Sequence, residues 1–193
     1  MALARLTAER DGRVARITLA RPDVRNAFNA ELIAELRRLF AELDARAGVR
    51  AIVLDGEGKV FSAGADITWM RASLDLSEEA NRRDAAAMSD MYRAIDNCSK
   101  PVITCVHGAA IAGAAGLCAV SDIVISADDA VFGFTETKLG IIPAVISPFV
   151  LAKIGVSHAR ALFLTGERFG AQRAQAIGLV HVVIPAGELD DAL

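Results

Sequence analysis

The sequence twice places a Gly/Ala-rich turn between an apolar strand pattern and the start of a helix. The first turn lies in residues 61–70 (FSAGADITWM) and the second in residues 106–116 (VHGAAIAGAAG). Because small side chains leave the backbone accessible, N–H groups in such turns can approach a ligand closely, at a helix end that favours negative charge. Each turn is therefore a candidate site for an oxyanion.

Taken singly, such a turn is also typical of close helix packing. Two N–H donors that converge on one carbonyl oxygen have a more specific use, because they stabilise a thioester enolate more strongly than the substrate. A third stretch, residues 130–143 (AVFGFTETKLGIIP), places the carboxylate of Glu136 among apolar and small residues. Outside this context, a glutamate close to Lys138 is better interpreted as a solvated or salt-bridged surface residue.

In these stretches the sequence resembles the enoyl-CoA hydratase/isomerase family, also called the crotonase superfamily. The resemblance runs from Val14 to Leu189 and rests on five ordered motifs: residues 25–27, 61–67, 106–122, 132–143, and 164–169 followed by 176–180. Residues 138–150 (KLGIIPAVISPFV) and 164–169 (LTGERF) look most like the bacterial methylglutaconyl-CoA hydratase branch. The resemblance implies one α/β domain over residues 1–193, built as a spiral of stacked ββα units.

The resemblance also assigns roles to residues. The N–H groups of Ala65 and Gly113 would bind the thioester carbonyl oxygen, and Glu136 would be the acid/base. Coenzyme A enters as part of the substrate, so no separate cofactor is expected. The residues implied to contact it are Arg25, Ala27, Ala63, Ala65, Asp66, Ile67, Gly113 and Thr135. Among the cations near the ligand loops, Arg25 is preferred over Arg21 and Lys59 as a phosphate ligand.

The acid/base set departs from that of the best-known hydratases, which use two glutamates. Glu136 occupies the second position, whereas Gly116 stands in the first. Because glycine cannot transfer a proton, Glu136 alone would serve as base and acid in turn, with a pKa raised by desolvation. Hydration of a 2-enoyl-CoA is placed first. Δ3,Δ2-enoyl-CoA isomerisation needs only one carboxylate and stays open as the alternative.

Composition excludes several other classes. The net charge of −3 and the absence of a basic stripe argue against nucleic-acid binding. The apolar runs are too short or too interrupted to span a membrane, and the N-terminus lacks a secretory pattern, so a cytoplasmic location is expected. Cys98, Cys105 and Cys118 show neither CxxC spacing nor an even count, and no metal site is expected.

Apolar periodicity predicts alternating strands and helices around these motifs. Residues 3–10 and 13–19 should form a hairpin about Asp11 and Gly12. Helices should begin after Asn29 and Ser77, the first stopping at Gly48, with Met88 and Met91 as core residues of the second. Further strands are expected at 51–54, 101–106, 122–126 and 180–184, and further helices near 113–120, 144–154 and 157–163.

Two functions of other classes remain. Family members continue with a helical segment that covers the active site and builds trimers, often paired into hexamers, and this chain is expected to end before that segment. It would then be a noncatalytic acyl-CoA binder or an assembly partner. A homotrimer or hexamer is the expected assembly.

A peptidase triad of Ser62, His107 and Asp122 is the least favoured alternative, because Ser62 lacks a nucleophile turn.

Overall fold

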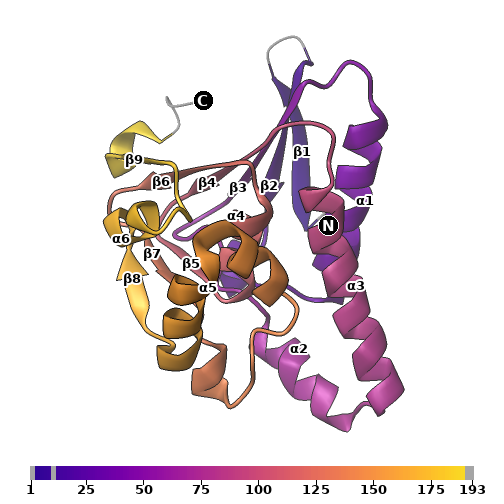
Figure 1. The fold of residues 1–193 in the computed structure, drawn as a ribbon. Coiled ribbons are helices and arrows are strands. Elements are labelled where there is room, and N and C mark those ends of the chain that lie inside the picture. Colours follow the sequence, from indigo (N-terminus) through magenta and orange to yellow (C-terminus); the bar gives the residue numbers. More distant parts are fainter. Residues whose placement is uncertain (1–2, 10–11, 190–193) are drawn as a thin grey trace.

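The computed structural model describes residues 3–9 and 12–189. Its strands are β1 (Ala4–Glu9), β2 (Val14–Leu19), β3 (Ala51–Gly56), β4 (Val102–Val106), β5 (Ala109–Ile111), β6 (Ile123–Ala127), β7 (Val131–Gly133), β8 (Arg168–Gly170) and β9 (Val182–Ile184). Its α-helices are α1 (Ala30–Ala45), α2 (Ile67–Ala72), α3 (Glu78–Asp96), α4 (Gly113–Val120), α5 (Ser147–Thr165) and α6 (Ala171–Ala176) (Figure 1). Short 3-10 turns, η1 to η4, cover Pro22–Val24, Ser73–Asp75, Glu136–Leu139 and Ala186–Glu188.

The strands form two sheets that the chain visits in turn. The larger sheet has the order β1-β2-β3-β4-β6-β9, with β1 antiparallel to β2 and the other neighbours parallel. The smaller sheet has the order β5-β7-β8. After β4 the chain crosses to β5 and then enters α4, and after β6 it crosses to β7. This repetition of strand, strand and helix confirms the predicted α/β spiral of ββα units.

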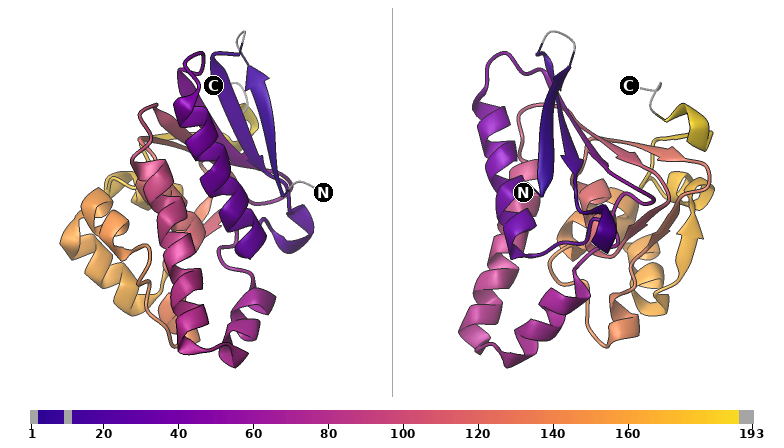
Figure 2. Two further views of the ribbon diagram at one scale, coloured as in Figure 1. Left: turned by 90° about the vertical axis from the view of Figure 1, so that its right-hand side faces the viewer. Right: turned by 180° about the vertical axis from the view of Figure 1, so that it is seen from behind.

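The first part of the chain folds much as its residue pattern predicts. The strands β1 and β2 pair as the expected hairpin, although Asp11 lies outside the described residues. The side chain of Asn29 accepts a hydrogen bond from the Leu32 N–H and so caps α1. This helix ends at Ala45, before Gly48. Figures 1 and 2 show α1 lying alongside α3.

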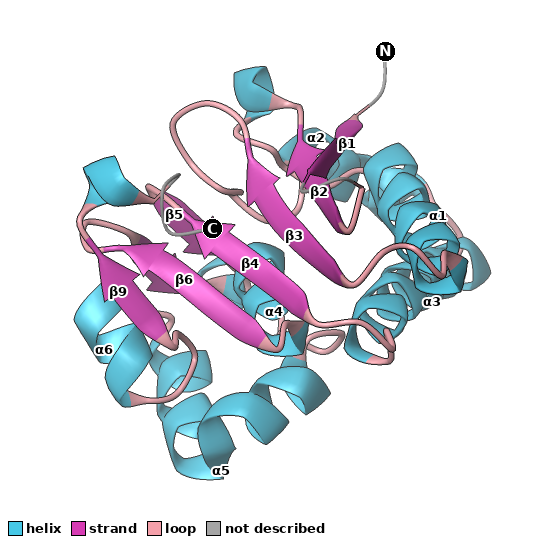
Figure 3. Ribbon diagram, turned by 90° about the horizontal axis from the view of Figure 1, so that it is seen from above, coloured by secondary structure: helices cyan, strands magenta, loops and turns pink. Residues whose placement is uncertain are grey.

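The larger sheet has apolar clusters on both faces. One cluster contains the buried leucines of α1 together with Met91, Tyr92 and Ile95 of α3. Figure 3 shows the helices gathered on one side of β3, β4, β6 and β9. A second, smaller cluster joins Val53, Cys105, Ile125 and Leu189. The sheet is thus held between apolar layers, which keeps the loops at its strand ends in fixed positions.

The predicted helices near 144–154 and 157–163 share the label α5, which begins at Ser147 and ends at Thr165. The two predicted segments are still visible, because Gly155 has non-helical angles (φ 76°, ψ 159°) and breaks the helix between them. Within the described residues, no helix combines the length and the hydropathy needed to cross a membrane.

Candidate active site

Backbone pairing brings the two Gly/Ala-rich turns together. The N–H of Ser62 donates to the Ala109 carbonyl (3.1 Å), and the N–H of Ile111 donates back to the Ser62 carbonyl (3.2 Å). Beyond this bridge, Gly64 lies so close to the second turn that a Cβ on it would be 3.4 Å from the Gly113 nitrogen. That Cβ would also be 2.5 Å from the Ile111 carbonyl oxygen, so only glycine fits at position 64.

Ala65 and Gly113 belong to the walls of one cavity. Both residues line it, and among the described residues neither amide donates a hydrogen bond to a protein acceptor. Their neighbours in the chain are bonded: Asp66 N–H donates to the Phe28 carbonyl (2.8 Å), and Ala112 N–H donates to the Gly133 carbonyl (2.7 Å). Gly113 is also the first residue of α4, where the helix dipole adds positive potential. Neither amide is therefore satisfied by the described part of the protein, and each can bind a ligand atom.

Glu136 lines the same cavity. Glu136 is the first residue of the 3-10 turn η3, which follows β7. It is only 9% exposed. Its Oε2 atom is buried and has no hydrogen-bond partner among the described residues. Burial raises the pKa of Glu136 above its ordinary value of 4.5, because desolvation penalises the charged form. Burial thus makes the protonated form of this carboxyl group easier to reach than for an exposed glutamate.

The position of the first family glutamate is closed by packing. A Cβ on Gly116 would lie 2.5 Å from Cγ2 of Ile146 and 3.1 Å from Cε1 of Tyr92. Gly116 is buried in α4 and is not among the residues that line the cavity, whereas Ile146 is one of them. The structure therefore removes Gly116 from the residues that face the substrate and puts an aliphatic wall in its place.

The cavity has a volume of about 770 Å³, which lies within the usual range for small-molecule sites. Of the residues predicted to contact coenzyme A, the cavity is lined by Arg25, Ala63, Ala65, Ile67, Gly113 and Thr135. Ala27 and Asp66, which the structure also describes, do not line it. Most of the remaining wall is apolar and comes from α2, α3 and residues 141–146.

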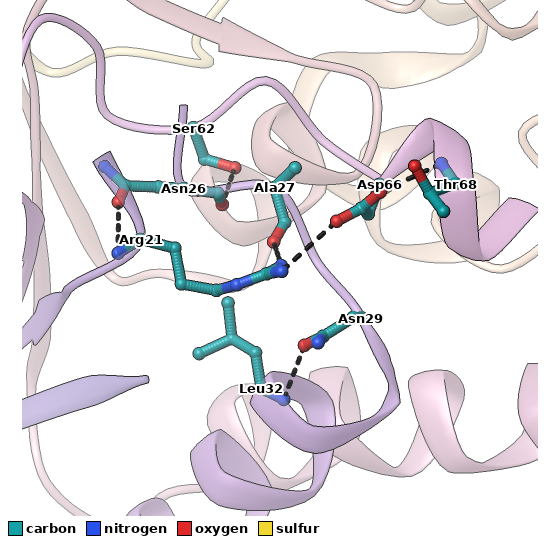
Figure 4. A network of polar contacts seen from close by, with 8 residues as sticks. All are labelled: Arg21, Asn26, Ala27, Asn29, Leu32, Ser62, Asp66 and Thr68. Atoms are coloured by element: carbon teal, nitrogen blue, oxygen red, sulfur yellow. Dashed lines mark hydrogen bonds and ion pairs between the residues drawn. The ribbon is translucent and has the colours of Figure 1, made fainter. Parts of the chain in front are cut away.

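The Arg21 side chain binds groups of the protein itself, so Arg21 is withdrawn as a candidate ligand of the coenzyme A phosphates. Its guanidinium donates to the Ala27 carbonyl and forms an ion pair with Asp66 (3.2 Å) (Figure 4). Asp66 in turn accepts from the Thr68 N–H and caps α2. Arg25 and Lys59 are exposed, and both remain candidates for binding a charged ligand.

The structure does not assemble the peptidase triad. The Ser62 hydroxyl is fully buried, donates to the Asn26 carbonyl (2.8 Å) and accepts from the Gly64 N–H (3.2 Å). Asp122 accepts instead from the Val102 N–H, and the His107 ring lies against the Gly58 carbonyl. Ser62 thus has a structural role in the first turn.

Residue patterns alone did not identify two contributors to the site. Tyr92 is fully buried beside Gly113 and Gly116. One feature of the sequence could have pointed to it: it is the only tyrosine of the chain and falls on the apolar face of a predicted helix. Met91 is buried in the core as predicted. Met88 is half-buried, packs against the core and also lines the cavity, so its predicted role as a core residue is incomplete.

Known proteins share this fold and much of this sequence. The model of the Enoyl-CoA hydratase/isomerase family matches residues 9–193. The crystal structure of an enoyl-CoA hydratase from Shewanella pealeana is 39% identical with a TM-score of 0.94, covering 99% of this chain and 71% of that one. For Pseudomonas aeruginosa AtuE the values are 38%, 0.95, 99% and 74%.

A curated relative extends further than this chain. Enoyl-CoA hydratase AFT6-1 of Alternaria alternata is 38% identical over 168 residues, which are 87% of this chain. The chain spans about half the length of that relative, 54%. The family match over nearly all residues, together with these relatives, settles the classification: this chain belongs to the enoyl-CoA hydratase/isomerase family.

Proposed function

We propose that the protein adds water to the double bond of a 2-enoyl-CoA thioester. The observation that carries the proposal is that Ala65, Gly113 and Glu136 line one cavity. Among the described residues, the amides of Ala65 and Gly113 have no protein acceptor, and the buried Oε2 of Glu136 has no hydrogen-bond partner. The names of the relatives support the same reaction class.

In this mechanism the thioester oxygen accepts hydrogen bonds from the Ala65 and Gly113 N–H groups. Ionised Glu136 takes a proton from a water molecule as the water oxygen bonds to the β-carbon. The electron pair of the double bond moves toward the carbonyl, and the resulting enolate is stabilised by the two amides. Protonated Glu136 then gives its proton to the α-carbon, which completes the addition of one water.

A second candidate reaction is Δ3,Δ2-enoyl-CoA isomerisation, and the closed position at Gly116 favours it. With Ile146 against Gly116, no carboxylate stands where two-glutamate hydratases have their first glutamate; besides Glu136, the described cavity is lined by the carboxylate residue Asp84, which comes from α3. Glu136 would remove a proton from the α-carbon of a 3-enoyl-CoA to form a dienolate, and would return the proton to the γ-carbon as the double bond moves to the α,β position. No water is consumed.

Product mass separates these reactions. The protein would be incubated with crotonyl-CoA, 3-methylglutaconyl-CoA and a 3-enoyl-CoA. Hydration adds the mass of one water, whereas isomerisation leaves the mass unchanged and shifts the double bond. The 3-methylglutaconyl substrate tests the branch that residues 138–150 resemble. Tight binding of acyl-CoA without turnover of any substrate would contradict both reactions and favour a noncatalytic binder.

We also propose that the protein assembles as a homotrimer or a hexamer. Several large apolar side chains near the cavity are exposed in the single chain, among them Ile67 (63%), Leu139 (62%) and Ile142 (74%). Such a group of exposed apolar residues is typical of a covered surface. Light scattering coupled to size-exclusion chromatography measures the mass directly, and a monomer at micromolar concentration would contradict this assembly.

A further inference from the structure

The backbone is strained immediately before the Gly113 amide, which is one of the two amides proposed to bind the oxyanion. Ala112, the residue before it, has φ 52° and ψ −117°, a conformation that a residue with a Cβ rarely adopts. Such strain persists only where surrounding contacts hold the backbone in place. The contacts on either side of the amide therefore decide where it points.

Three hydrogen bonds hold this segment. On the N-terminal side, Ala112 N–H donates to the Gly133 carbonyl (2.7 Å). On the C-terminal side, the Tyr92 hydroxyl donates to the Gly113 carbonyl (2.7 Å). The unbonded Gly113 N–H lies between these two bonds. It shares its peptide plane with the Ala112 carbonyl, which accepts from the Gly116 N–H (3.2 Å), while the bond from Tyr92 restrains the next peptide plane.

The tyrosine is itself held firmly. It is fully buried and packs against Phe149, with ring centroids 5.9 Å apart. Its hydroxyl lies 3.0 Å from the position of a Cβ on Gly113, and its ring lies 3.1 Å from that of a Cβ on Gly116. Burial and the charge of Glu136 raise the pKa of Tyr92 well above its ordinary value of 10.0, so the phenol remains a hydrogen donor.

We propose that Tyr92 is a positioning residue, which holds the Gly113 amide in the direction required to bind the substrate carbonyl. This inference rests on the proposed function, because it assumes that the Gly113 amide binds an acyl-CoA oxygen. Tyr92 does not exchange protons in this account. Its hydroxyl acts through the backbone, from α3 to the first residue of α4.

The test compares Tyr92→Phe with Thr104→Val. The first variant removes only the hydroxyl from Tyr92. The second removes a buried hydroxyl that bonds to Ser121 (2.6 Å) away from the cavity, and so controls for a general loss of stability. Two properties would be measured for each: kcat and KM with the active substrate, and the absorbance of bound 2,4-hexadienoyl-CoA recorded by rapid mixing. The band of this conjugated thioester moves to longer wavelength when its carbonyl accepts hydrogen bonds.

For Tyr92→Phe we expect kcat to fall about tenfold with KM within about twofold, less than the 10²–10³ lost when a donor is removed outright. The shift of the absorbance band should shrink as well, whereas Thr104→Val should keep both properties. An unchanged kcat and band shift in Tyr92→Phe would overturn the inference, and so would equal losses in the two variants. If the wild-type protein gives no band shift at all, the proposed function fails together with the inference.

A second measurement keeps the question answerable if Tyr92→Phe does not fold. Because the chain has one tyrosine, growth with 3-fluorotyrosine labels position 92 alone. The fluorinated phenol keeps its hydroxyl, so kcat and the band shift should stay within about twofold of wild type, and its 19F resonance should report the buried site. A large loss of band shift despite an intact hydroxyl would overturn the positioning role.

Discussion

Ile146 occupies the space that a side chain at Gly116 would need, with its Cγ2 atom 2.5 Å from the position of a Cβ on that glycine. The two residues come from different elements, since Gly116 lies inside α4 and Ile146 precedes α5. Their contact means that a packed wall stands where two-glutamate hydratases have their first glutamate, and the proposed chemistry uses Glu136.

Gly116→Glu is therefore expected to damage the fold without adding a second acid. Overpacking and an unpaired buried carboxylate together should cost at least about 2 kcal/mol of unfolding free energy. Denaturant unfolding measures this loss. Adding Ile146→Ala opens space beside the new side chain and should recover part of it. A single Gly116→Glu variant with wild-type stability and faster hydration would show that the position is open.

Glu136→Gln should abolish turnover and leave the fold intact. Removing a general acid/base lowers kcat by roughly 10²–10⁴-fold, while the amide keeps the shape of the side chain. Steady-state kinetics measures kcat, and Glu42→Gln, a change on the exposed face of α1, is the control. Activity within about tenfold of wild type in Glu136→Gln would refute the assigned role.

The same residue predicts how stability depends on pH. The pKa of Glu136 is raised in the folded protein, so its favourable contribution is complete below the ordinary value of 4.5 and is lost as pH rises through the folded-state pKa. Glu136→Gln lacks this loss. The melting temperature of the variant minus that of wild type should therefore increase between about pH 4 and about pH 7.5. A constant or falling difference would mean that the carboxyl group is not desolvated.

Gly64 provides a test of the first turn. Gly64 and Gly12 both have positive φ, 87° and 78°, so alanine is strained at either position. Only at Gly64 does the new Cβ also meet backbone, at the Ile111 carbonyl. Gly64→Ala should lower kcat by at least about 10²-fold through the displaced amides, whereas Gly12→Ala should change stability by about 1 kcal/mol and leave kcat unchanged. Equal kinetics in the two variants would separate this turn from catalysis.

Arg25 is expected to bind the phosphates of coenzyme A. Because Arg25 has φ 56°, asparagine is the replacement that best keeps the backbone. Arg25→Asn should raise KM about tenfold with little change in kcat, as expected for loss of one charge-assisted hydrogen bond. Arg37→Gln, on the exposed side of α1, should leave KM unchanged. An unchanged KM in Arg25→Asn would shift the assignment to Lys59.

The sequence predicts local features of this fold well. The hairpin, the caps at Asn29 and Ser77 and the break near Gly155 follow from short-range patterns in the chain. What it does not show are contacts between distant segments. Ile146, which packs against Gly116, lies 30 positions away from it in the sequence, and Tyr92 lies 21 positions from Gly113, to which it is bonded. Neither contact leaves a local pattern in the sequence. The ion pair of Arg21 with Asp66 is hidden for the same reason.

The central claim is that the Ala65 and Gly113 amides bind one acyl oxygen beside Glu136. A crystal structure of the protein with a bound acyl-CoA tests this most directly. The account predicts a thioester oxygen within about 3.1 Å of both backbone nitrogens, with the Glu136 carboxyl group facing the neighbouring carbons. A bound thioester whose oxygen contacts neither nitrogen, or whose reactive carbons lie away from Glu136, would contradict it.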